Sequence, residues 1–130
     1  MLSLPASIRI FVYAGATDMR RSFDRLAQMV EEHLEQDPES GHLYLFFNRR
    51  RNCVKMLLWE ADGFVIWYKR LEEGTFVFPM PDEQRSTVGT HGLLIRPAEL
   101  AMLLEGIDLS PIKRRKRYQR PTSAKSAPQG

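Results

Sequence analysis

The chain of 130 residues has room for one domain, and its 43% of hydrophobic residues is enough for a packed core. Its longest apolar runs, 43–47 and 64–68, are far shorter than the roughly 20 residues of a membrane-spanning helix, and we expect no signal peptide. Because Cys53 is the single cysteine, an intrachain disulfide and a cage of thiolate metal ligands are excluded. We expect the chain to reside in the reducing cytoplasm.

The net charge of +3 conceals an uneven distribution along the chain. From Lys113 onward there are seven basic residues and no acidic ones, which leaves 12 basic and 16 acidic residues in 1–112. The body therefore carries about −4 and the tail +7. The tail is also rich in proline, serine and alanine. We predict one domain over 1–112 and a disordered basic tail over 113–130.

The first predicted elements are a strand and a helix. Residues 8–14 are β-branched and aromatic and predict a strand. The chain then breaks at a glycine, with Thr17 or Asp18 as the expected N-cap of a helix. Apolar residues recur every three or four positions over 19–34, which predicts a helix of about four turns with one apolar stripe.

Three short apolar runs follow, at 43–47, 54–60 and 64–70. They are too short and too rich in β-branched and aromatic residues to be helices, so they predict strands. A further short strand is expected at 75–78. The polar, glycine-containing stretch 82–92 is expected to be a loop.

The last predicted element is a helix over 97–105. Pro97 suits its first position and Gly106 suits the position just after its end. Together these elements predict an α+β fold: a small antiparallel β-sheet of about four or five strands packed against a helix in the N-terminal half and a C-terminal helix, with a disordered basic tail.

The hairpin over 54–70 has a predicted register. A three-residue loop over 61–63, with Gly63 in the left-handed conformation, pairs Glu60 with Phe64 and Leu58 with Ile66. The helix is then expected to cover an apolar face made of Val54, Met56, Leu58, Phe64, Ile66 and Tyr68. The opposite, mixed face is expected to contain Lys55, Leu57, Trp59, Val65, Trp67 and Lys69.

Catalytic chemistry leaves few traces in this sequence. His33, His42 and His91 stand singly, without the spacing of metal-binding pairs. Cys53 begins a predicted strand and is expected to pack as a small hydrophobe. Glycine-rich nucleotide loops and nucleophile motifs are absent, and the acidic residues occur in pairs that are expected to face water. We predict no enzyme activity, no metal or other cofactor, and no small-molecule substrate.

Two basic clusters are candidate contacts for phosphate. Arg49, Arg50 and Arg51 should project from the tip of the hairpin between the second and third strands, where three like charges favour an anion. The tail can displace counterions from a nucleic-acid backbone without reading sequence, and an acidic protein partner is the alternative. Its candidate residues are Lys113, Arg114, Arg115, Lys116 and Arg117.

A third candidate is the pair Arg20 and Arg21, at the predicted start of the first helix. Free backbone N–H groups there could help to hold an anion. The alternative is that Asp18 and Asp24 pair with these arginines, and this simpler interpretation is slightly favoured.

A fourth candidate combines Lys55, Lys69 and Arg70 with Trp59 and Trp67 on the sheet. Charge and flat rings together can form a stacking platform for single-stranded nucleic acid. Tryptophan on a small sheet belongs more often to the core, so the stacking role is the weaker alternative.

Five segments of the sequence resemble the TnpB family, the accessory proteins of bacterial insertion-sequence-66 transposons. The segments are 15–24, 40–51, 55–59, 63–72 with the adjoining 74–76, and 103–108, with Thr-Asp-Met-Arg in the first and Asn-Arg-Arg-Arg in the second. The residues that match the family motif are Thr17, Asp18, Met19, Arg20, Ser22, Asp24, Asn48, Arg49, Arg50, Arg51, Trp59, Tyr68, Lys69 and Arg70.

The resemblance implies a non-catalytic protein required for DNA transposition, acting beside the transposase and other proteins of the same element. The expected partners are DNA, at the transposon ends or without sequence preference, and the transposase. The residues leave two functions open. The first is an accessory factor that binds nucleic acid. The second is a module that docks on the transposase without touching DNA, which the acidic body favours.

Overall fold

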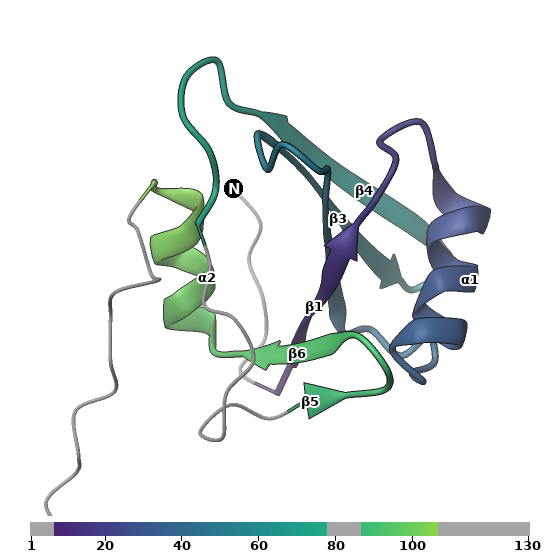
Figure 1. The fold of residues 1–130 in the computed structure, drawn as a ribbon. Helices are drawn as coiled ribbons and strands as arrows, with labels where there is room; N and C mark the ends of the chain where they lie inside the picture. The colour runs from purple at the N-terminus through teal and green to yellow at the C-terminus, as the bar shows by residue number, and fades with distance from the viewer. Residues whose placement is uncertain (1–6, 78–86, 107–130) are drawn as a thin grey trace, which may run out of the picture.

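A computed structural model describes residues 7–77 and 87–106. The strands form one sheet in the order β4-β3-β2-β1-β6-β5, with one helix on each face (Figure 1). In chain order the elements are β1 (Ile10–Ala16), α1 (Phe23–His33), β2 (Leu43–Phe47), β3 (Cys53–Glu60), β4 (Gly63–Arg70), β5 (Thr87–Val88), β6 (Gly92–Ile95) and α2 (Pro97–Leu104).

The sheet is mixed. β1 and β2 are parallel, and the other neighbouring strands are antiparallel. A parallel pair needs a crossover connection, and α1 supplies it. The predicted α+β class is confirmed, but the description of the sheet as antiparallel is corrected by the β1–β2 pair. The prediction of a loop over 82–92 is also wrong in its described part, because β5 and the start of β6 lie there.

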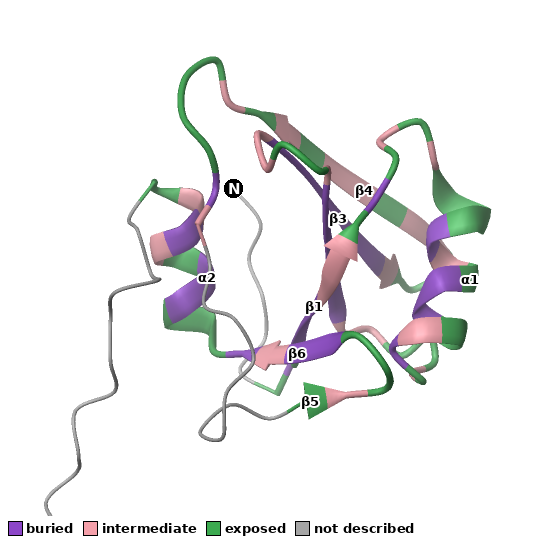
Figure 2. Cartoon of the chain, in the orientation of Figure 1, coloured by how far each residue is buried: buried purple, intermediate pink, exposed green. Residues whose placement is uncertain are grey.

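The central strands of the sheet are covered on both faces, which explains why all five residues of β2 are buried. In Figure 2, β3 is largely buried, whereas β4 at the edge is intermediate or exposed. On one face, α1 and its C-cap residue Leu34 pack against the sheet. Leu26, Met29, Val30 and Leu34 contact a core that includes Phe11, Tyr44, Phe46 and Leu57. On the other face, α2 packs Leu100 and Leu103 in a core that includes Ile10, Val12, Leu43, Leu45, Phe47, Val54, Met56 and Leu58. Side chains along each central strand therefore alternate between the core under α1 and the core under α2.

The predicted register of the β3–β4 hairpin is wrong by one residue. Glu60 pairs with Gly63 and Leu58 with Val65, so the loop has two residues and Ala61, with φ +52°, takes the left-handed conformation. A shift of one residue moves every side chain of β4 to the other face. Phe64, Ile66 and Tyr68 therefore share the α1 face with Lys55, Leu57 and Trp59. Val65, Trp67 and Lys69 share the α2 face with Val54, Met56 and Leu58.

The first helix begins later than predicted. Ser22 occupies the N-cap position, and α1 starts at Phe23. The predicted caps have other roles. The Asp18 carboxylate accepts a hydrogen bond from the Arg20 backbone N–H at 2.9 Å, which stabilises a turn before the helix. The Thr17 N–H donates to the Phe47 carbonyl at 2.8 Å and so continues the contact between β1 and β2.

The remaining predictions differ in outcome. The C-terminal helix is confirmed, with Pro97 in its first turn and Gly106, at φ +89°, just after the C-cap. The strand predicted at 75–78 is wrong in its described part, because residues 75–77 form no strand. The Phe76 N–H donates instead to the Arg51 carbonyl at 2.6 Å. Within 7–77 and 87–106, no helix is long and apolar enough to cross a membrane.

Candidate nucleic-acid interface

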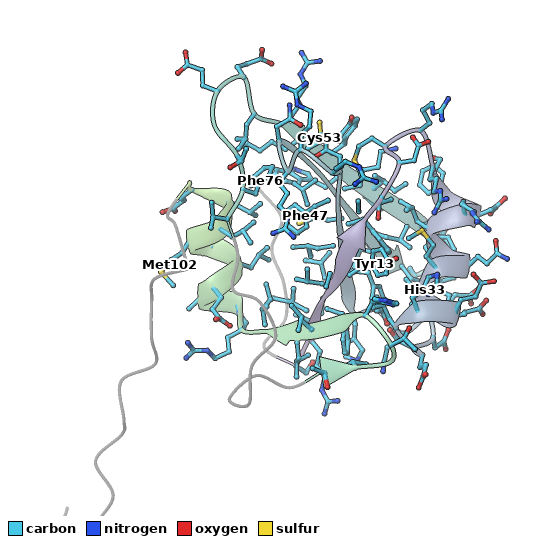
Figure 3. All side chains as sticks on the ribbon, in the orientation of Figure 1. Tyr13, His33, Phe47, Cys53, Phe76 and Met102 are labelled. Carbon is cyan, nitrogen blue, oxygen red and sulfur yellow. The ribbon has the colours of Figure 1, made fainter. Side chains whose placement is uncertain are left out.

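The topology brings together the ends of β1, β2 and β4 and the start of β3, all at the same end of the sheet. β1 and β2 run parallel and end together, with Ala16 beside Phe47. β3 begins where β4 ends, with Cys53 beside Arg70 at the end of the sheet where Cys53 is labelled in Figure 3. The loops after β1 and β2 and the segment after β4 therefore meet. We call this end of the sheet the basic edge, as distinct from the outermost strands β4 and β5. Its basic residues are Arg20, Arg21, Arg49, Arg50, Arg51, Lys55, Lys69 and Arg70.

The basic edge has an excess of positive charge. The acidic residues in the same segments are Asp18, Asp24, Glu72 and Glu73, four against the eight basic residues. Every candidate basic residue that lies within the described parts of the chain belongs to this edge. Such a concentration of cations attracts phosphate and releases the counterions bound to a nucleic-acid backbone.

The loop between β2 and β3 is held by two asparagines. The Asn48 side-chain oxygen accepts hydrogen bonds from the backbone N–H groups of Asn52 and Cys53, both at 3.0 Å, and its amide nitrogen donates to the Asn52 side-chain oxygen at 2.7 Å. Arg51 is half-buried, with φ +59°, and its carbonyl accepts a hydrogen bond from the Phe76 N–H. Arg49 and Arg50 are exposed at the tip, so the loop presents two guanidinium groups on a fixed backbone.

Two other arginines are exposed but already paired. Arg20 binds Asp18 through both carboxylate oxygens, with a closest contact of 2.7 Å, although 91% of the Arg20 side chain is exposed. The hydrogen bonds from Arg20 lower the pKa of Asp18 to about 2. Arg70 binds Glu72 at 3.2 Å. The Arg20–Asp18 pair confirms the simpler interpretation for Arg20, and the two pairs leave Arg49 and Arg50 as the stronger candidates for contact with phosphate.

Three of the candidate cations have structural contacts. Lys55 is buried, and its ammonium group donates to the Arg21 carbonyl at 2.7 Å and lies 5.0 Å from the centre of the Tyr68 ring. The Lys69 ammonium lies 3.4 Å from the Leu104 carbonyl at the C-terminus of α2, where a cation is favoured. The Arg21 guanidinium lies 3.2 Å from the Met29 sulfur.

The structure does not support the predicted stacking platform. Trp59 and Trp67 lie on opposite faces of the sheet because of the corrected register. Trp59 packs edge-to-face on Phe64, with ring centres 4.9 Å apart, and Trp67 packs against the α2 core. The tail residues Lys113, Arg114, Arg115, Lys116 and Arg117 lie outside the described residues.

The fold also brings together side chains that the sequence does not connect. The rings of His33 and His91 are 6.0 Å apart, and each lies within 6 Å of the Tyr13 ring, as Figure 3 shows for Tyr13 and His33. The two histidines are 58 positions apart, so no local spacing could have revealed the cluster. Among the described residues, no group of three or more His, Cys, Asp or Glu side chains could hold a metal ion.

These features define a class of protein: a small α+β domain with helices on both faces of its sheet and arginines gathered at one edge. The chain belongs to the family described as IS66 Orf2 like protein, whose pattern it matches over residues 8–114. This family supplies an accessory protein of IS66 insertion sequences, so the chain has an accessory role in transposition.

Two relatives come from Sinorhizobium fredii (strain NBRC 101917 / NGR234). The uncharacterized protein y4hO is 34% identical over 108 residues, which cover 83% of this chain and 88% of the relative. The uncharacterized protein y4jC is 30% identical over 122 residues, which cover 94% of this chain and 97% of the relative. No solved structure matches this chain.

Proposed function

We propose that this protein is a non-catalytic accessory factor that binds DNA through the phosphate backbone at the basic edge. The observation that carries the proposal is the convergence at one edge of eight basic residues from four separate segments. Arg49 and Arg50 are the principal contacts because both are exposed on a loop that Asn48 and Asn52 hold in place.

Arg20 and Arg70 have a secondary role in this proposal. Each side chain is exposed, and each can exchange its carboxylate partner for a phosphate, because an exposed ion pair contributes little free energy. The basic tail adds a contact without sequence preference. Guanidinium groups on a phosphate backbone position a protein on DNA but do not read bases, so the proposal predicts weak sequence preference.

The test is fluorescence-anisotropy binding of the full chain to duplex and single-stranded DNA across a salt series. The main variant is Arg49→Ala combined with Arg50→Ala. Each lost phosphate contact should reduce the slope of log K against log salt by about 0.9 on duplex DNA, so the double variant should lose nearly 2. The matched control is Arg9→Ala. Arg9 is an exposed arginine next to the start of β1, at the end of the sheet opposite the basic edge.

A second variant separates the basic edge from the tail. Replacing the five basic residues of 113–117 by glutamine should weaken binding but leave the effect of the tip substitutions intact. If the double tip variant binds like the parent chain, both with the native tail and with the neutral tail, the basic edge is not the DNA contact.

A second function is favoured by the charge of the body. The excess of acidic residues in 1–112 is compatible with docking on a basic protein, and Glu31 and Glu32 are exposed on the outer side of α1. In this alternative the chain binds the transposase and does not touch DNA. Co-purification of the two proteins that survives nuclease treatment supports the alternative, and loss of the complex on nuclease treatment contradicts it.

A further inference from the structure

β4 is an open edge of the sheet. It is eight residues long and pairs with β3 on one side, and no other described strand pairs with it. None of its eight residues is buried, whereas six of the eight residues of β3 are. An edge strand of this length presents unpaired backbone N–H and C=O groups to another strand. β5, at the opposite edge, has two residues.

The side chains of β4 are also unusually apolar for an edge. The large exposed hydrophobic residues in the described parts of the chain are Phe23, Val65 and Tyr68, and two of these lie on β4. Val65 is 39% exposed and Tyr68 is 52% exposed, and they lie on opposite faces of the sheet. Partner strands that cover β4 would therefore gain apolar contacts on both faces.

We propose that β4 pairs with β4 of a second copy of this chain, in antiparallel orientation around Ile66, to form one continuous sheet of two subunits. The inference goes beyond the proposed function and does not depend on DNA binding. A two-fold axis through Ile66 places residues whose numbers add to 132 opposite each other. The two copies then contribute the same strand to the interface.

The side chains that face each other in this register are complementary. On the α1 face, Ile66 lies opposite Ile66 of the second copy, and Tyr68 lies opposite Phe64. On the α2 face, Val65 lies opposite Trp67. Aromatic pairs and pairs of aromatic with β-branched residues are the stabilising cross-strand contacts in antiparallel sheets.

The charges at the two ends of β4 select the antiparallel arrangement. Lys69 and Arg70 end the strand, and Glu60 and Asp62 precede it. Antiparallel pairing brings Arg70 next to Asp62 of the second copy, twice in the dimer. Parallel pairing would place the cations of both copies side by side, which is unfavourable.

The same residues select the register. A shift of two residues in one direction places Tyr68 opposite Asp62 and removes the pair of Tyr68 with Phe64. A shift of two residues in the other direction places Glu72 opposite Asp62, two like charges. The register around Ile66 is therefore the one that keeps both the aromatic contacts and the opposite charges.

The test is sedimentation equilibrium of the full chain without DNA, with charge reversals at the two facing positions. Asp62→Arg and Arg70→Asp each turn both attractive contacts into repulsive ones and should weaken dimerisation about tenfold. An equimolar mixture of the two single variants restores opposite charges at both contacts and should recover the dimer. The double variant in one chain should recover it as well.

The matched control is Glu31→Arg, a charge reversal on the exposed side of α1, which should leave dimerisation unchanged. Circular dichroism should show that each variant is folded. The inference is overturned if the parent chain is monomeric up to its solubility limit. It is also overturned if the parent dimer persists unchanged in both single variants, or if the mixture fails to restore it.

Discussion

The exposed arginines of the basic edge differ in how far a neighbouring carboxylate already neutralises them. Arg49 and Arg50 stand on the asparagine-stabilised loop, whereas Arg20 binds Asp18 and Arg70 binds Glu72. The paired arginines contribute less net charge to the edge than their number suggests. The difference explains why counting cations in the sequence overstates the candidate site.

The pair of Asp18 and Arg20 leads to a prediction about pH. Arg20 holds the pKa of Asp18 at about 2, below the ordinary value of 3.8. A carboxylate whose pKa is lowered by folding stabilises the folded chain at every pH above its ordinary pKa. This contribution is lost as the pH falls from about 4 through 2. In Arg20→Ala the pKa of Asp18, measured by NMR titration of the carboxyl carbon, should rise toward 3.8.

Arg21→Ala is the control for this titration, since the charge of Arg21 is the last of the causes that lower the pKa of Asp18. It should raise the pKa much less than Arg20→Ala does. Equal shifts in the two variants would mean that general charge, and not the hydrogen bonds from Arg20, sets the pKa.

The turn between β5 and β6 is docked on the C-terminal end of α1. The Thr90 N–H donates to the His33 carbonyl at 3.1 Å and so satisfies an acceptor at the helix end. Gly89 lies directly against this contact, with φ +62°, and a β-carbon at position 89 would collide with the His33 carbonyl oxygen. The close approach of two segments 56 positions apart therefore requires glycine here.

Gly89→Ala should destabilise the fold. The left-handed backbone costs about 1–2 kcal/mol for a residue with a β-carbon, and the collision with the helix end adds to this cost. The expected loss is about 2 kcal/mol or more in the free energy of unfolding, measured in urea. Gly74→Ala is the matched control, because Gly74 has φ +80° but open space around it. An equal loss in both variants would show that the turn does not press on α1.

The elements themselves were predictable to different degrees. β1, β2, β3, β4 and both helices follow from local periodicity, with shifts of a few residues at their ends. β5 and β6 were missed because both strands are short and flanked by polar turns. They become strands only through pairing, β6 with β1 and β5 with β6. The hairpin register failed because the presence of Gly63 suggested a three-residue loop, whereas Ala61 takes the left-handed position.

The arrangement of the whole molecule connects the two proposals. In an antiparallel pair of β4 strands, the two-fold axis is perpendicular to the sheet, so the basic edges of the two copies face opposite directions. A dimer of this kind would present two separate copies of the proposed DNA site. A protein that acts in transposition could use these sites to hold two segments of DNA.

The dimer should therefore bridge two duplexes, a prediction that rests on both proposals. The test uses the chain in which the five basic residues of 113–117 are replaced by glutamine. Its dimer should link a labelled duplex to a second duplex that is immobilised on a support. Asp62→Arg in the same background should still bind one duplex, because Asp62 lies at the end of its own sheet opposite that copy's basic edge, but should lose the bridging. Bridging by a monomeric variant would contradict the prediction.

The sequence predicted each basic cluster of the candidate site separately, but not that the clusters lie together. Each basic cluster was visible along the chain, and so were the uneven charge and the motif blocks of the family. Their convergence was not visible, because it depends on α1 crossing over so that β1 and β2 end at the same edge. The sequence also could not show that Lys55 is buried, since the Arg21 carbonyl and the Tyr68 ring lie beside its ammonium group only in the folded chain, and the corrected register places Tyr68 opposite Lys55.

The sequence by itself determined the type of each long element, the class of the fold and the family, because these follow from residues that are neighbours along the chain. Only the tertiary structure decided which cations lie together and which are exposed, how β1 pairs with β2, and which strand is left at the edge. These features depend on contacts between residues tens of positions apart, such as Thr17 with Phe47 and His33 with Thr90. Such contacts form when both faces of one sheet are buried, and no local pattern records them.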